Sequence, residues 1–378
     1  MPRRSTKRPS TSAIPETDGA APASDGFLDV ELAARLGGSL ARRRSLPASY
    51  RPGALEVELD ELTQLAQARV AIESGLEPPG APRARVLDRA EWVAANVASV
   101  ERLVGPAMTA AAARRKAPVP PSIERLGRRS SAAQLGSVLA WMSSRVLGQY
   151  DVLVGEEASV DEDVISYVGP NLVALEQRHG FDPSQFRLWL ALHESAHRAQ
   201  FTGAVWVRPY FLGLIDEVVG ALSADPSALL SGLLRSIKEI SQGRNPLAEV
   251  GAVGLVATPG QLEALHKLTA LMSVLEGHGE VIMDVAAQDL VPDHARFHQV
   301  LRQRRESLGA PARLLNQLLG LEAKLRQYEE GEHFVRLLRD AGGPELVTSL
   351  FDGPERLPDL TELKEPERWL ERAGIRNG

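Results

Sequence analysis

The segment DPSQFRLWLALHESAHRAQF, residues 182–201, carries the strongest structural signal in the chain. It starts like a helix, because Asp182 suits the N-cap, Pro183 suits the first turn and Gln185 has the spacing of a capping box. An almost unbroken apolar run follows, which is typical of a helix buried in a core. We therefore predict a well-capped helix with an apolar approach to HESAH, residues 193–197.

On such a helix the two imidazoles of HESAH project from the same face, because His193 and His197 are one turn apart. Two neutral imidazole nitrogens at this spacing can bind one zinc ion, and Glu194 can reach a zinc-bound water without being a ligand. Glu194 is then the general base of a hydrolytic reaction. The chain has no cysteine, so every metal ligand must be His, Asp or Glu.

A third ligand has to come from elsewhere, because a catalytic zinc ion usually has three protein ligands and one open position. The segment LMSVLEGHGEVIMD places Glu276, Glu280 and Asp284 at four-residue steps, near one face of a predicted helix. We expect Glu276 to be the ligand, because Gly277 permits another element to approach closely there. Glu280 is the alternative ligand. Glu280 or Asp284 could otherwise hydrogen-bond a ligand histidine.

Further polar residues have weaker support. His278 points away from the carboxylate stripe, so it is expected to line the cleft or to pack. Tyr328 could stabilise an oxyanion or lie on a helix surface, and Arg208 could line the cleft or form a structural ion pair. The pair His294 and His298 has helical spacing but no adjacent acid, which indicates ordinary helix surface.

The composition favours a helical protein, since aromatic residues are 5% of the chain while Leu and Ala recur throughout. Only residues 150–155 and 164–168, just before the HESAH helix, have the pattern of strands. Helices are predicted at residues 29–36, 54–75, 88–115, 131–148, 209–222, 226–241, 259–290, 294–307, 311–340 and 344–351.

Residues 1–26 are rich in Pro, Ser, Thr, Ala and Gly, which is typical of a disordered tail. We expect a single domain over residues 27–378, with a helical part at 27–148 and a metal-binding part at 149–378. A net charge of -6 gives no reason to expect nucleic acid, and no apolar run is long enough to cross a membrane. The absence of cysteine fits the cytoplasm, where we expect the protein to act with Zn²⁺ and no organic cofactor.

Beyond these patterns, the chain resembles a bacterial family of zinc-dependent metalloproteases and hydrolases with a zincin-like fold. One branch of that family is associated by gene neighbourhood with biosynthesis of a deazaflavin coenzyme. The resemblance rests on the HESAH and EGHGE segments together with LDRAEWVAANV (87–97), VLGQYDVLV (146–154), VGPNL (168–172), GLEAKLRQYEEGEHFV (320–335) and LPDLTELKEPERWLERA (357–373).

The resemblance implies a mainly α, zincin-like domain with a small β-sheet next to the active-site helix. It also implies that His193, His197 and a glutamate of the EGH segment, residues 276–278, hold the metal, with Glu194 catalytic. EGHGE is similar to the glutamate motif of gluzincin peptidases, which favours Glu276, although the separation from His197 is far longer than in common gluzincins.

These observations predict a zinc-dependent hydrolase, with a peptide or amide as its substrate and metallopeptidase as the leading activity. Two alternatives stay open. One is a small-molecule amide hydrolase of a cofactor pathway, which a deep and narrow pocket would favour. The other is a non-catalytic protein whose zinc only ties helices together, which a closed site with four protein ligands would favour.

Overall fold

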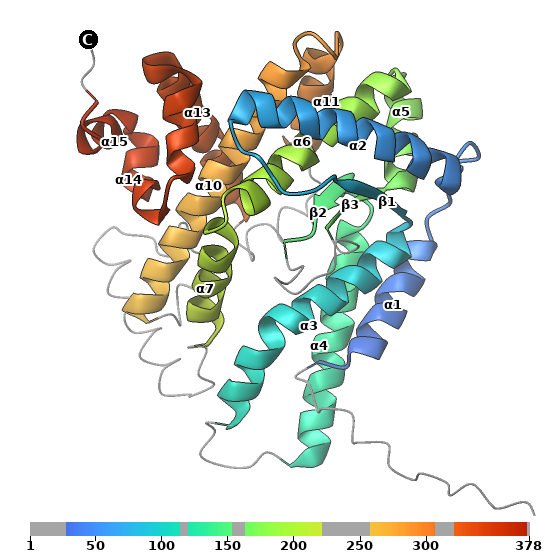
Figure 1. The fold of residues 1–378 in the computed structure, drawn as a ribbon. Helices are drawn as coiled ribbons and strands as arrows, with labels where there is room; N and C mark the ends of the chain where they lie inside the picture. The colour runs from blue at the N-terminus through green and yellow to red at the C-terminus, as the bar shows by residue number, and fades with distance from the viewer. Residues whose placement is uncertain (1–27, 114–119, 153–162, 221–257, 307–320, 376–378) are drawn as a thin grey trace, which may run out of the picture.

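The computed structural model describes residues 28–113, 120–152, 163–220, 258–306 and 321–375 (Figure 1). The expected tail at residues 1–26 and the expected helix at 226–241 lie outside the described residues. The described helices are α1 (Val30–Arg42), α2 (Pro52–Ser74), α3 (Arg89–Ala113), α4 (Pro121–Met142), α5 (Gly169–His179), α6 (Pro183–Gly203), α7 (Val207–Gly220), α10 (Pro259–Ala287), α11 (His294–Glu306), α13 (Leu321–Thr348), α14 (Leu360–Lys364) and α15 (Pro366–Arg372), with short 3-10 turns η3 (Ser349–Phe351) and η4 (Pro354–Arg356).

The predicted mainly α architecture with one small sheet is confirmed (Figure 1). The sheet has three strands, β1 (Arg83–Leu87), β2 (Gly148–Tyr150) and β3 (Val164–Val168), in the order β1-β3-β2. Strand β3 is parallel to β1 and antiparallel to β2. Helix α2 packs on β1 and helix α6 packs on β2, so the sheet lies beside the HESAH helix.

Strand β3 has the predicted bounds, whereas the other two strands differ from the prediction. Strand β2 begins at Gly148 and ends at Tyr150, while the expected strand began at residue 150. Strand β1 was not predicted, because it directly follows a Pro- and Gly-rich loop and only Val86 and Leu87 of it are buried. A five-residue strand with arginines at alternate positions gives little hydrophobic signal.

Two helices also differ from the prediction. Helix α4 begins at Pro121 and not near residue 131, because that proline occupies the first helical turn and does not belong to the preceding loop. Helix α1 continues to Arg42, past two glycines that are poor helix formers. Tertiary packing offsets their low propensity, since a Cβ atom on Gly37 would lie 2.7 Å from the carbonyl oxygen of Gly136 in α4.

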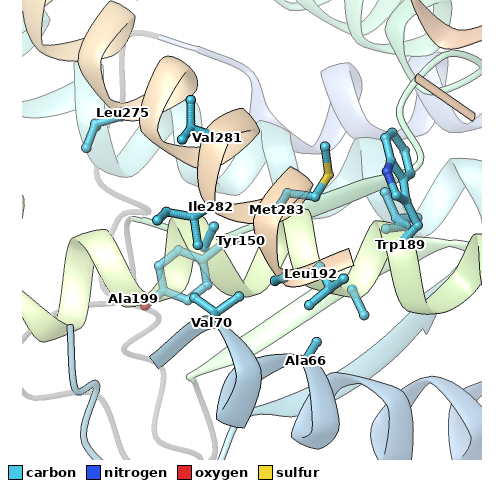
Figure 2. Packing of buried hydrophobic residues seen from close by; sticks show 14 of the residues in the cluster. Ala66, Val70, Tyr150, Trp189, Leu192, Ala199, Leu275, Val281, Ile282 and Met283 are labelled. Carbon is cyan, nitrogen blue, oxygen red and sulfur yellow. The ribbon is translucent and has the colours of Figure 1, made fainter. Parts of the chain in front are cut away.

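The largest hydrophobic core surrounds α6 and α10 (Figure 2). Ala66 and Val70 of α2 face Leu192 and Ala199 of α6, and Ile282 of α10 lies on the other side of α6. Burial of each large aliphatic side chain stabilises the fold by about 1.5–3 kcal/mol. The backbone that carries HESAH is therefore held by packing on several sides. None of the helices in the described part of the chain combines the length and the apolar character of a membrane span.

Helix α10 is in backbone contact with α13 beside Glu276. A Cβ atom on Gly277 would lie 2.2 Å from the carbonyl carbon of Gly331, and one on Gly331 would lie 2.0 Å from the carbonyl oxygen of Ser273. The close approach expected at Gly277 is thus present, and α13 is the element that approaches. Backbone atoms cannot rotate away, so any side chain here would push the two helices apart.

We therefore expect Gly277→Ala to lower the free energy of unfolding of the metal-free protein by about 1–3 kcal/mol, the usual cost of overpacking. Gly213→Ala is the matched control, because Gly213 is inside α7 and a Cβ atom there would have no neighbour within 4 Å. That control is expected to stabilise the protein by up to about 1 kcal/mol. Denaturant titration measures both, and an equal effect of the two substitutions would refute the packing argument.

Candidate metal centre

Both helices that carry the candidate ligands have defined starts. In α6, Asp182 accepts a hydrogen bond from the backbone N–H of Gln185 at 2.9 Å, as the sequence predicts. The Gln185 side chain, however, does not complete a capping box, because it accepts from the N–H of Asp293 and so ties α6 to the start of α11. Helix α10 begins with a complete capping box between Thr258 and Gln261. These caps fix the register of the two helices.

The structure brings the three predicted ligands together. The Nε2 atoms of His193 and His197 lie 3.3 Å apart, and one ligand atom from each of these residues and from Glu276 lies within 4.8 Å of the others. Two nitrogens about 2.0–2.1 Å from one zinc ion in tetrahedral geometry stand about 3.3 Å apart. All three side chains are partly exposed, so an ion can enter from solvent. The donor set therefore fits zinc.

Glu194 lies beside this cluster and is almost fully buried, with 5% of its surface exposed. Its Oε2 atom accepts a hydrogen bond from the backbone N–H of Tyr150 in β2 at 3.1 Å. Gly148 makes this approach possible, because a Cβ atom there would lie 2.5 Å from Oε1 of Glu194. The strand thus holds one oxygen of the carboxylate. Gly148 was not predicted as a site residue, since a glycine in a strand gives no signal of what approaches it.

The environment of Glu194 suits proton transfer. The pKa of this carboxyl is raised to about 7, mainly by burial and also by the negative charge of Glu276, while His197 and the N–H of Tyr150 oppose the shift. A general base works best when its pKa lies near the working pH, because it can then both accept and donate a proton. In the metal-free protein, the pKa of Glu194 already lies near neutral pH.

The other acids of the predicted stripe have partners outside the cluster. The Oε2 atom of Glu280 lies 3.4 Å from Nε2 of His298 in α11. Asp284 is 2.5 Å from the guanidinium of Arg336 in α13. The hydrogen bond that the His298 imidazole donates to the carboxylate of Glu280 raises the pKa of His298. One expectation is corrected here: His298 is not ordinary helix surface, since its side chain is mostly buried and faces Glu280.

Gln200 is a hydrogen-bond partner of the candidate ligand His197 and was not predicted as a site residue. Its Oε1 atom lies 3.0 Å from Nδ1 of His197. Its spacing of three residues from His197 on a helix would have been a usable signal. His278, the next neighbour of Gln200, is fully buried, and its ring packs against the edge of Phe351. Burial lowers the pKa of His278 to about 3, so this imidazole is neutral at neutral pH.

The structure describes the side chain of one of the two further candidates, Arg208. Arg208 at the start of α7 donates a hydrogen bond to the hydroxyl of Tyr150 at 2.7 Å. This contact attaches α7 to the end of β2. The side chain of Tyr328 lies outside the described residues, so its predicted role in stabilising an oxyanion stays a prediction.

Comparisons with known proteins give the family of the chain and a similar fold. The chain belongs to the zincin-like metallopeptidase family, whose model matches residues 28–370. Its fold is similar to a crystal structure from Chloroflexus aurantiacus described as "a putative hydrolase with a novel fold", with a TM-score of 0.67 and 24% sequence identity. That match covers 92% of this chain and 99% of the other. Curated proteins gave no match.

Proposed function

We propose that this protein is a zinc-dependent hydrolase, with peptide or amide bonds as its substrates and metallopeptidase as the leading activity. The observation that carries the proposal is the convergence of His193, His197 and Glu276, with Glu194 buried beside them. Within the described residues the cluster contains three possible ligands and not four. Three protein ligands with one open position are typical of catalytic zinc, whereas four are typical of structural zinc.

Each residue has a distinct role in the proposed reaction. His193, His197 and Glu276 would hold the ion, which when bound supplies a Lewis acid that lowers the pKa of water toward about 7. Glu194 accepts the proton of the attacking water and delivers it to the leaving amine. The N–H of Tyr150 holds Oε2 of Glu194, which leaves Oε1 for the water. Membership of the zincin-like metallopeptidase family supports this assignment.

Metal analysis and a substrate screen test the proposal. Purified protein is expected to contain close to one zinc per chain by mass spectrometry of the metal. It should hydrolyse members of a peptide library or a panel of small amides, stop when zinc is chelated and recover when zinc is returned. If only small amides are hydrolysed, the proposed activity changes from peptidase to amidase. If the protein binds zinc but hydrolyses nothing in either panel, the proposed enzymatic activity is refuted. If it binds no zinc after loading, the proposed metal centre is refuted.

The choice between the two candidate third ligands is a separate prediction. We expect Glu276→Gln to weaken zinc binding well beyond the loss in Glu280→Gln, because only the first removes a charged ligand atom. Loss of a group that merely supports a ligand typically costs about 10–100-fold in affinity. Competition with a chromophoric chelator measures both dissociation constants. Weaker binding by Glu280→Gln than by Glu276→Gln would move the ligand to Glu280.

A further inference from the structure

Gln200 connects the two helices that carry the proposed ligands. It is fully buried on α6 and makes three contacts. Its Oε1 lies 3.0 Å from Nδ1 of His197, and its Nε2 lies 2.7 Å from the carbonyl oxygen of Leu275 and 2.9 Å from Nδ1 of His278. Leu275 directly precedes Glu276 on α10. One amide group therefore contacts a ligand on one helix and the residue beside a ligand on the other.

The direction of every hydrogen bond in this group follows from the carbonyl of Leu275. A carbonyl oxygen can only accept, so the atom of Gln200 that faces it must be the amide nitrogen. The second N–H of the same nitrogen points to Nδ1 of His278, which must accept it. The amide oxygen is then the atom that faces His197. An oxygen without hydrogen can only accept, so Nδ1 of His197 must carry the proton and donate it.

This assignment determines the other ring nitrogen of His197. A neutral imidazole that is protonated on Nδ1 has a free lone pair on Nε2. That Nε2 atom is the one that lies 3.3 Å from Nε2 of His193 in the cluster. The hydrogen bond to Gln200 also limits rotation of the ring. His197 is thus held in the tautomer and the orientation that a metal ligand needs before any ion is bound.

We infer that Gln200 is a positioning residue: it fixes the tautomer of His197 and joins that ligand to the segment of α10 that presents Glu276. The inference rests on the proposed metal centre. The carbonyl of Leu275 keeps the amide from turning over, since a flipped amide would place its oxygen against that carbonyl oxygen, and His278 accepts the second N–H of the same amide. Two oxygens without a hydrogen between them would repel each other.

A merely structural role is the alternative, because a buried amide that binds a helix carbonyl also stabilises the contact between α6 and α10. The two roles predict different measurements. A structural amide would affect the melting temperature alone, whereas a positioning residue also changes zinc affinity and the tautomer of His197. Gln67 of α2 provides a matched control. It is also a buried glutamine, and its Oε1 accepts from Arg198, the residue directly after His197 on α6, at 2.9 Å.

The experiment compares wild type, Gln200→Met and Gln67→Met, since methionine has a similar volume and no amide. We expect Gln200→Met to bind zinc about 10–100-fold more weakly than wild type in chelator competition, the usual loss for a partner of a ligand. Gln67→Met should keep the zinc affinity of wild type even if its melting temperature falls. Equal zinc affinities of Gln200→Met and wild type, with both folded, would overturn the inference while leaving the metal centre intact.

A second measurement needs no metal, and its first part uses the wild type alone. In ¹⁵N-histidine NMR spectra of the metal-free wild type, the neutral form of His197 is expected as the Nδ1–H tautomer alone. Gln200→Met should instead show a mixture of the two tautomers. An Nε2–H tautomer of His197 in the wild type would overturn the inference even if Gln200→Met failed to fold. A wild type that binds no zinc would refute the proposed function separately, because the tautomer is read without the ion.

Discussion

Replacement of Glu194 by glutamine is expected to abolish hydrolysis while the fold and the zinc site persist. Glutamine has the same shape, and its amide oxygen can still accept the N–H of Tyr150 that holds Oε2 of Glu194. Glu194 is not one of the three clustered ligands, so the dissociation constant for zinc should change little. What the variant lacks is the basic oxygen that takes the proton of water. A missing general base typically costs about 10²–10⁴-fold in rate.

The metal-free stability of this variant gives an independent check of the Glu194 environment. Burial raises the pKa of the carboxyl to about 7, above its ordinary value of 4.5. The folded protein therefore binds this proton more tightly than the unfolded chain does, and stability is lost as the pH rises through the range between these two values. Glutamine has no such proton, so metal-free Glu194→Gln should be at least as stable as wild type at pH 8.

Substitution of a second buried glutamate serves as the control, because it distinguishes a loss of catalysis from a loss of stability. Glu176 of α5 is also buried but pairs with Arg187, 2.8 Å away, and has no place in the proposed reaction. Glu176→Gln is expected to lower the melting temperature and to keep the turnover of each folded molecule. The comparison uses the best peptide or amide from the substrate screen. Wild-type turnover in Glu194→Gln would show that another group is the base.

The sequence was most informative where local signals and burial coincide. The capped α6, the capped α10 and strand β3 all combine a recognisable start or pattern with a continuous apolar face. The break in α13 at Gly342 and Gly343 also falls where separate helices were expected, because Gly343 has a φ of 73° that favours glycine. In contrast, α1 continues through Gly37 where α4 packs against it, and that distant contact leaves no local pattern.

The same distinction applies to the candidate site. His193, Glu194 and His197 form one short motif, and Glu276 belongs to a stripe of acids on one helix, so both could be found from spacing. The support around them depends on which elements meet in space. Nothing in the sequence near Gly148 indicates that β2 approaches Glu194, and nothing near residue 298 indicates that its imidazole faces Glu280. Residues that serve a site across elements therefore required the structure.

Removal of either imidazole is expected to empty the metal centre. His193→Ala or His197→Ala deletes one of two nitrogens that lie 3.3 Å apart and leaves a single imidazole with Glu276. Loss of a ligand atom should exceed the 10–100-fold loss that is typical of supporting residues. Zinc content should therefore fall from about one per chain toward zero after dialysis. His294→Ala is the control, because His294 belongs to the other i, i+4 histidine pair and lies outside the cluster.

Thermal denaturation provides a second measurement on the same variants. An ion that binds only the folded state stabilises it by an amount that grows with the ratio of free zinc to the dissociation constant, about 2.7 kcal/mol at a hundredfold ratio. Added zinc should raise the melting temperature of wild type and of His294→Ala. It should not raise that of His193→Ala or His197→Ala at the same concentration. Full zinc content with a normal thermal shift in either variant would exclude that histidine as a ligand and would overturn the proposed centre.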